Sequence, residues 1–294
     1  MSDFIISSES IMDLSSEYVE ELGVSFIKSN YELNGKIFLD DFGKSLDMDS
    51  FYRDMENGSC PSTAAINTQE YLNYFKELFK EGKDILHVCL SSGLSTQYSC
   101  LLQAIEILKE DYPDRKIYTL DSKMASSGVG LIVKKLVDYK NKGLSIEELY
   151  QWAEENYLHV NCYTSNENLE YLARGGRISK TAAGIGKHLH ICPLIEFDAT
   201  GHMYVSQKIR TKKRLLNTMI KKMQENAYDG SEYADDVFVN HAYNEKVAIE
   251  IRDMILANFK NIKDVKIFNI GPTIGTHIGP GSVSIFFWGE NIRE

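Results

Sequence analysis

The chain has 294 residues, 43% of them apolar, and a formal net charge of −10. This length and apolar content predict a globular protein with one large or two ordinary domains. No apolar run approaches the ~20 residues of a membrane-spanning helix, and the negative charge argues against general nucleic-acid binding. The five cysteines include no Cys-x-x-Cys pair. They therefore argue against a disulfide framework or a zinc site and favour a reducing, cytoplasmic location.

The first half of the chain alternates short apolar runs with helical patterns, which is typical of a parallel sheet covered by helices. Strands are predicted at 4–6, 24–27, 85–90 and 116–120, and helices at 16–22, 96–109 and 127–139. A further helix begins at a capping box formed by Ser145 and Glu148. Asn34-Gly35 lies between alternating residues and predicts a two-residue hairpin outside the main sheet.

The second half repeats the alternation with longer strands. They are predicted at 159–164, 194–197, 203–209, 237–241, 265–270 and 283–288, with helices after Thr211 and Asn244. A hairpin turn at 198–201 indicates a mixed, partly antiparallel sheet. Because no flexible linker separates the halves, we expect two α/β domains, residues 1–160 and residues 161–294, with a rigid interface. The first is expected to have three layers, α/β/α, around its parallel sheet.

Two hydroxyl-rich loops precede helices in the first half. Ser-Ser-Gly-Leu-Ser-Thr at 91–96 follows a predicted strand and opens the next helix, a place where open α/β sheets bind ligands. Ser-Cys-Pro-Ser-Thr at 59–63 precedes the helix that Asn67 opens. The N–H and hydroxyl groups of these loops suit a phosphate and a carboxylate equally well. An ordinary helix cap is the simpler interpretation of each loop.

A basic window extends from Arg174 to Lys222. It contains eleven Lys and Arg and two acidic residues, a net charge of +9, which leaves −19 on the rest of the chain. Such a window is either a solvated helix face or a docking face for an acidic partner. Within it, the two histidines of His188-Leu189-His190 would point apart on a helix. No third ligand is evident, so we assign no metal.

Four glycines and two prolines surround His277 in the segment 271–281, between two predicted strands. This composition predicts a tight turn through which neither a helix nor a strand can run, with a backbone that can approach a ligand closely. The glycine spacing matches neither the P-loop nor the dinucleotide-binding fingerprint. The segment either holds a ligand beside His277 or is a plain connection between two strands.

Five segments, taken in order, resemble the DegV family over nearly the whole chain. They are Glu-Ser-Ile-Met-Asp-Leu at 9–14, Ser-Ser-Gly-Leu-Ser at 91–95, Leu-Asp-Ser-Lys at 120–123 with Ala125-Ser126, Leu-Glu-Tyr-Leu-Ala-Arg-Gly-Gly-Arg-Ile-Ser at 169–179, and the His277 segment. The resemblance implies a two-domain α/β structure like part of the dihydroxyacetone kinase fold. It also implies one long-chain fatty acid, such as palmitate or oleate, held in a tunnel between the domains.

The same resemblance implies a carrier with no catalysis and no cofactor of its own. Such proteins serve as the fatty-acid-binding subunit of bacterial fatty acid kinase. They present the carboxylate to the ATP-binding kinase subunit, which makes acyl-phosphate for phospholipid synthesis. Transient contact with a membrane surface is also expected, whereas nucleic acid is not an expected partner.

Residue by residue, the family's carboxylate-binding positions match hydroxyls and the histidine of this chain. They are Ser59, Ser62, Ser92, Ser95, Thr276 and His277. The positions that dock the kinase and assist phosphate transfer match Arg174, Arg177 and Arg210. Two departures stand out. Glu9 replaces the usual Asp, and Gly58-Ser59-Cys60-Pro61 stands where many relatives have Thr-Ser-Gln-Pro, so Ser59 or Ser62 is expected to supply the missing hydroxyl.

Two other functions compete with the carrier. A serine hydrolase acting on an acyl ester would use Ser92 or Ser95 with Asp121 and His277, although the Gly-x-Ser-x-Gly elbow is absent. A nucleic-acid-binding regulator would use the basic window, but it conflicts with the overall negative charge and lacks a recognition motif. The carrier is therefore the preferred interpretation.

Overall fold

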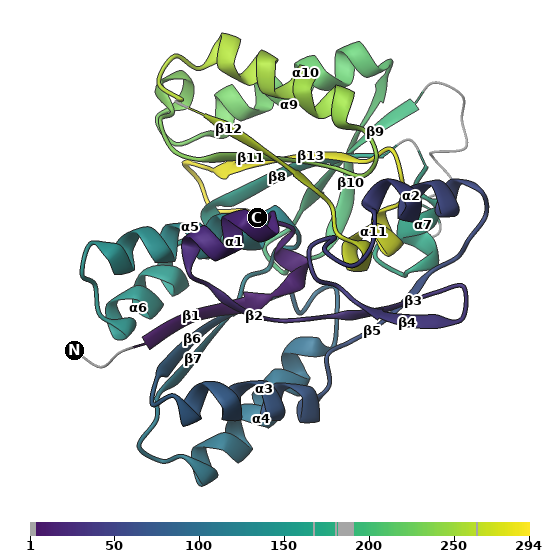
Figure 1. Ribbon diagram of the computed structural model, residues 1–294. Coiled ribbons are helices and arrows are strands. Elements are labelled where there is room, and N and C mark those ends of the chain that lie inside the picture. Colours follow the sequence, from purple (N-terminus) through teal and green to yellow (C-terminus); the bar gives the residue numbers. More distant parts are fainter. Residues whose placement is uncertain (1–3, 167, 180, 182–190, 263) are drawn as a thin grey trace.

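The computed structural model describes residues 4–166, 168–179, 181, 191–262 and 264–294. Two large sheets lie one above the other, with helices between them and on both outer sides (Figure 1). A third, small sheet lies beside them. This arrangement confirms the predicted fold class, an α/β protein with one parallel and one mixed sheet. Within the described residues no helix has the length and apolar character needed to cross a bilayer.

The N-terminal sheet is entirely parallel, with strand order β2-β1-β6-β7. Its strands are β1 (Phe4–Glu9), β2 (Ser25–Ile27), β6 (Asp84–Cys89) and β7 (Ile117–Asp121). The helices are α3 (Thr68–Lys80) and α4 (Gln97–Asp111) on one face, and α1 (Ser16–Leu22), α5 (Ser127–Asn141) and α6 (Ile146–Asn156) on the other. Side chains of β6 alternate between the two faces: Ile85 packs with α3 and α4, whereas Leu86 packs with α5. The strand is therefore buried on both sides, as parallel strands usually are.

The C-terminal sheet is mixed, with strand order β10-β9-β8-β13-β11-β12. Its strands are β8 (Val160–Ser165), β9 (Ile191–Phe197), β10 (Met203–Arg210), β11 (Val237–His241), β12 (Val265–Asn269) and β13 (Val283–Trp288). Helices α9 (Lys212–Asn226) and α10 (Glu245–Asn258) cover its outer face. Among the described strand pairs of this sheet, β11 and β12 are the only parallel one. The predicted turn at 198–201 joins the antiparallel strands β9 and β10.

Helix α5 connects the two sheets because it contacts strands of both. It contacts β1 and β6 on one side and β8, β11 and β13 on the other. Its buried apolar residues are Val129, Leu131, Ile132, Val133, Leu136 and Val137, whereas Lys134 and Lys135 are half-buried and form ion pairs with aspartates. Because the apolar side chains of α5 pack against strands of both sheets, the two sheets share one continuous core.

The small sheet has strand order β4-β3-β5 and packs beside helix α2 (Met48–Glu56). Its strands are β3 (Asn30–Leu33), β4 (Lys36–Leu39) and β5 (Ser62–Ala64). Asn34 and Gly35 both have positive φ, 52° and 77°, which confirms the predicted hairpin turn. Strand β5 was not predicted, because it is only three residues long and follows Pro61. The remaining short elements are α7 (Glu170–Arg174) and the 3-10 helices at Ser10–Met12, Tyr157–His159 and Gly230–Glu232.

The segment around His277 corrects the sequence prediction of a turn without helix. Residues Pro272–Ile278 form a helix, α11. Pro272 occupies the first turn, where proline is favoured, and Gly279 ends the helix with φ 80°. Only Gly275 lies inside it, and a Cβ there would lie 2.5 Å from the Tyr52 hydroxyl oxygen. Pro272 and Gly279 therefore lie at the two ends of the helix, and Gly275 lets the Tyr52 side chain pack closely against it. None of the three prevents the helix.

Candidate functional site

A cavity of ≈570 Å³ lies where the two large sheets and the small sheet meet. Residues of the first half reach it from β5 and from the loop that follows β6, and residues of the second half reach it from β8, α11 and β13. Its volume is within the range of about 300–1,000 Å³ that is usual for small-molecule sites. The cavity is therefore shared by both halves of the chain.

Apolar side chains form a large part of the cavity lining. They are Ile11, Leu90, Leu94, Ala125, Leu172, Phe197, Met203, Ile270, Ile274, Ile278 and Phe286. The few polar groups among them are satisfied by one another: the Thr164 and Ser284 hydroxyls form a hydrogen bond of 2.5 Å, and the Cys162 thiol lies 3.3 Å from Thr164 Oγ1. This part of the cavity suits a hydrocarbon chain.

Hydrogen-bonding side chains also line the cavity, among them His277 of α11. Its Nε2 lies 2.8 Å from the Thr63 hydroxyl of β5. On the other side of the ring, a Cβ on Gly175 would lie 2.6 Å from Nδ1, so only glycine leaves room for the imidazole there. Ser92 and Ser95 line the same cavity from the loop after β6. Hydroxyl and imidazole groups of this kind can donate hydrogen bonds to an anion.

The electrostatics around His277 favour a neutral imidazole. Burial, together with the positive charges of Arg177 and Arg174, lowers the His277 pKa from 6.5 to about 4. At neutral pH one ring nitrogen therefore donates and the other accepts. Arg177 lines the cavity and is half-buried, and desolvation lowers the pKa of its guanidinium. The positive charge nearest to this polar wall thus belongs to arginine and not to histidine.

Two buried carboxyl groups hold the beginning of α11 and thereby the position of His277. Asp13 Oδ1 accepts from the Gly271 N–H at 2.8 Å, and Ser126 Oγ donates to Oδ2. Asp40 Oδ2 accepts from the Thr273 hydroxyl at 2.7 Å and from the Thr273 N–H at 3.3 Å. Burial raises the pKa of Asp13 well above its usual value and that of Asp40 to about 6.

The raised pKa of Asp40 predicts a pH effect on stability. Between its ordinary pKa of 3.8 and its folded pKa of about 6, the folded state binds more protons than the unfolded state. The contribution of this group to the free energy of unfolding therefore falls as pH rises through that window. Between pH 4 and pH 7, urea unfolding should show wild type losing about 2–3 kcal/mol relative to Asp40→Asn. An equal difference between the two proteins at both pH values would contradict this.

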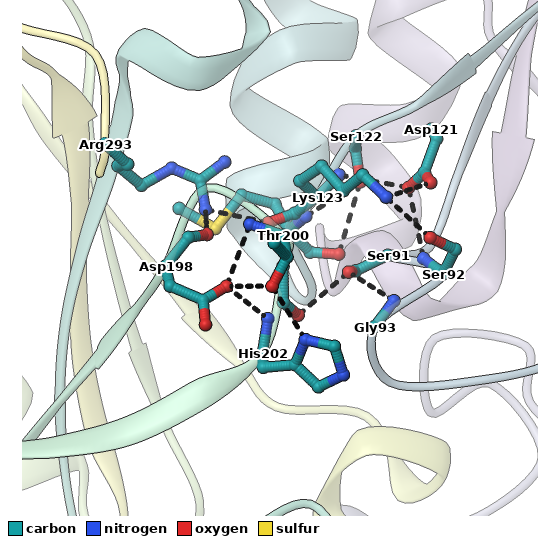
Figure 2. Close-up of polar contacts among 12 residues, drawn as sticks. Ser91, Ser92, Gly93, Asp121, Ser122, Lys123, Asp198, Thr200, His202 and Arg293 are labelled. Carbon is teal, nitrogen blue, oxygen red and sulfur yellow. Dashed lines mark hydrogen bonds and ion pairs between the residues drawn. The ribbon is translucent and has the colours of Figure 1, made fainter.

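A second polar cluster joins the loop after β6 to the β9–β10 hairpin (Figure 2). Ser91 Oγ donates to the Gly201 carbonyl at 2.9 Å and accepts from the Gly93 N–H at 3.1 Å. The contact is close, because a Cβ on Gly93 would lie 2.7 Å from the Gly201 carbonyl atoms. Phe197 and Met203, on either side of this hairpin tip, line the cavity. The hairpin therefore covers one side of the cavity and rests on the first half of the chain.

Four of the residues predicted from the sequence line the cavity: Ser92, Ser95, Arg177 and His277. Thr63 lines it as well and was missed. Alternation along β5 is the signal that could have found Thr63, because Ser62 and Thr63 point to opposite faces of the strand. Recognising it requires knowing that 62–64 is a strand.

The other predicted residues lie outside the cavity lining. The Ser59 hydroxyl donates to Asn34 Oδ1 at 3.2 Å, Ser62 lies on the exposed face of β5, and the Thr276 hydroxyl donates to the Pro272 carbonyl inside α11 at 2.8 Å. Arg174 is exposed, with Nη1 3.1 Å from Cys60 Sγ, and Arg210 is exposed at the end of β10. His188 and His190 fall outside the described residues, and within those residues no cluster of metal-ligating side chains is found.

The geometry does not assemble the hydrolase. His277 is hydrogen-bonded to Thr63, the Ser95 hydroxyl accepts from the Gln97 N–H, and the Ser92 hydroxyl accepts from Lys123. Asp121 forms an ion pair with Lys123. A catalytic triad requires one hydrogen bond between the serine nucleophile and the histidine base, and a second between the histidine and the acid. Neither bond is formed among these described residues.

Comparisons with known proteins agree with this architecture. The model of a family described as "Uncharacterised protein, DegV family" matches residues 4–290. A DegV domain-containing protein of Clostridium perfringens is 32% identical over 290 residues, covering 99% of each chain. The structure of DegV from Bacillus subtilis, described as a fatty acid binding protein, has a TM-score of 0.83 and 25% identity, covering 98% of this chain and 99% of that one. A DegV family protein from Thermus thermophilus, described with fatty acid binding, has a TM-score of 0.86 and 21% identity, covering 98% and 100%.

Proposed function

Because this chain belongs to the DegV family, we propose that it binds one long-chain fatty acid, such as palmitate or oleate, in the cavity between residues 1–160 and 161–294. The observation that carries the proposal is a cavity lined both by many apolar side chains and by hydroxyls, His277 and Arg177. This combination suits an amphiphile with a long hydrocarbon tail and one small anionic head. The fatty acid binding described for the two structural relatives supports the same ligand class.

In this proposal the carboxylate accepts hydrogen bonds from Ser92, Ser95 and the Thr63–His277 pair, with Arg177 supplying positive charge. Thr63 thereby takes the role expected of Ser59 or Ser62. Each charge-assisted hydrogen bond contributes about 1.5–3 kcal/mol, whereas the roughly fifteen carbons of a C16 tail contribute about 0.8 kcal/mol per buried methylene. The tail should therefore dominate affinity, and the head should set the position of the ligand.

We further propose that the protein is a carrier and not an enzyme, and that a kinase subunit acts on the carboxylate it presents. Arg174, Arg177 and Arg210 belong to the window with a net charge of +9, which is suited to an acidic partner. The five free cysteines are in keeping with a cytoplasmic location. Arg210→Ala should slow acyl-phosphate formation with the cognate kinase while leaving fatty-acid binding unchanged, and a normal rate would contradict this docking role.

The fatty-acid proposal is tested by mass spectrometry of lipids extracted from the purified, denatured protein. The expected result is about one fatty acid per chain, because one cavity encloses one tail. If the protein is purified without bound lipid, it should bind added palmitate with the same stoichiometry. A protein that neither carries nor binds a fatty acid would refute the proposal, and covalent labelling of Ser92 or Ser95 by a serine-directed phosphonate would favour the hydrolase.

A further inference from the structure

Lys123 lies just beyond the carboxyl end of β7 in an unusual conformation. Its φ is 50°, in the left-handed region that few residues other than glycine adopt. Its N–H donates to Asp121 Oδ1 at 3.3 Å, and its carbonyl accepts from Arg293 Nη1 at 2.9 Å. Gly201 of the β9–β10 hairpin packs against it so closely that a Cβ there would lie 3.0 Å from Lys123 Cα. Three contacts, with Asp121, Arg293 and Gly201, hold Lys123 in this strained backbone conformation. Strained conformations of this kind are found mostly at functional sites.

The side chain of Lys123 reaches back to the cavity loop (Figure 2). Its Nζ donates to the Ser92 hydroxyl at 2.6 Å and pairs with Asp121 Oδ2 at 2.7 Å. Asp121 Oδ1 accepts from the Ser92 N–H at 3.1 Å, which closes a ring of three residues. The Lys123 side chain is 22% exposed and that of Asp121 13%, whereas Ser92 is exposed, so the ring is open to water on the Ser92 side.

The hydrogen bond from Lys123 affects whether the Ser92 hydroxyl donates or accepts in its other hydrogen bonds. An ammonium group has donors only, so Ser92 Oγ must accept from Lys123, and its own proton is left to be donated elsewhere. The Ser92 N–H is already used by Asp121, and Ser92 lines the cavity. After the bond from Lys123, Ser92 Oγ keeps its proton and one lone pair, and only the proton can bind a ligand group that accepts and does not donate.

We propose that Lys123 is a positioning residue that directs the Ser92 hydroxyl to donate its proton toward the ligand and so favours a carboxylate head group over a neutral one. The inference rests on the proposed function and names the head-group selectivity of the same site. A carboxylate only accepts, and its hydrogen bonds are roughly twice as strong as those of neutral groups. An alcohol can turn its own hydroxyl to suit Ser92 in either role, so it gains little from a fixed donor.

The test compares palmitate with hexadecanol, which has the same tail and a neutral head. Dissociation constants for both ligands are measured for wild type, Lys123→Met, Lys123→Arg and the control Lys116→Met. Lys123→Met should weaken palmitate binding about tenfold and change hexadecanol binding by less than about twofold. Lys123→Arg, which keeps a charged donor, should restore most of the palmitate affinity. Lys116 forms an ion pair with Glu147 at the opposite end of β7, and its replacement should change neither constant.

An equal loss for both ligands, or no loss, would overturn the role of Lys123, because a merely structural ion pair cannot distinguish the two head groups. If Lys123→Met does not fold, Lys123→Gln takes its place, and palmitate affinity should then fall below that of Lys123→Arg. Wild-type protein that binds hexadecanol but not palmitate, or neither, would refute the proposed function as well. Wild type that binds palmitate, with equal losses in Lys123→Met, refutes the Lys123 inference alone.

Discussion

Replacing His277 with alanine should weaken fatty-acid binding by roughly 10- to 100-fold, the equivalent of one charge-assisted hydrogen bond of about 1.5–3 kcal/mol. Thr63→Val, which keeps the shape of the side chain and removes the hydroxyl, should cause a loss of the same order, because Thr63 Oγ1 and His277 Nε2 are 2.8 Å apart. The double variant should lose less than the sum of the two, since each residue orients the other. Isothermal titration with palmitate measures all three.

Ser62→Ala is the matched control for Thr63→Val. The two residues are neighbours on β5, but Ser62 lies on the exposed face and does not line the cavity. Its replacement should leave the dissociation constant unchanged. A loss for Ser62→Ala as large as that for Thr63→Val would show that the family-based assignment of the hydroxyl was correct and that the geometry had misled us.

Replacing Gly201 with alanine should lower the free energy of unfolding by about 3–5 kcal/mol, among the largest effects expected of a single substitution. Gly201 has φ 83°, where a side chain is strained, and a Cβ there would lie 2.0 Å from Ser91 Oγ and 3.0 Å from the backbone of Lys123. The hairpin tip would have to move away from the loop after β6. Because Phe197 and Met203 flank this tip and line the cavity, palmitate affinity should fall together with stability.

Gly143→Ala is the control that separates the backbone strain of a positive φ from the steric clash expected in Gly201→Ala. Gly143 also has a positive φ, 95°, but a Cβ there meets no atom within 4 Å. Its replacement should cost only the backbone term, about 1–2 kcal/mol, and leave palmitate affinity unchanged. If urea unfolding gave the same loss for both glycines, the close packing of the hairpin on the loop would contribute nothing to stability.

Much of the fold could be predicted because its signals are local. The apolar runs of β1, β6 and β7, the Ser145 capping box of α6 and the Asn34-Gly35 turn each depend on residues adjacent in the chain. Patterns of this kind predict a helix, strand or turn without knowledge of what that element packs against. The parallel and mixed sheets followed from the same patterns, because alternation of strands with helices permits few topologies.

The errors and omissions have a common physical origin. Helix α11 was interpreted as a turn because glycine and proline are common in turns. In the structure Pro272 and Gly279 bound the helix, and Gly275 makes room for Tyr52, 223 residues away in the chain. Strand β5 is three residues long and is held by pairing with β3. Residues next to β5 in the chain do not predict this pairing. Thr63 was missed for that reason, and Ser59 and Ser62 were chosen in its place.

By itself, then, the sequence determined most of the elements, the fold class and the family, and it predicted Ser92, Ser95 and His277 as carboxylate-binding residues and Arg177 as a docking residue. The tertiary structure alone decided which hydroxyl meets His277, how buried Asp13 and Asp40 hold α11, and how Lys123 orients Ser92. The reason is one of range. Hydrophobic periodicity and capping act between neighbours in the chain, whereas a hydrogen bond across a cavity depends on the packing of segments as far apart as Thr63 and His277.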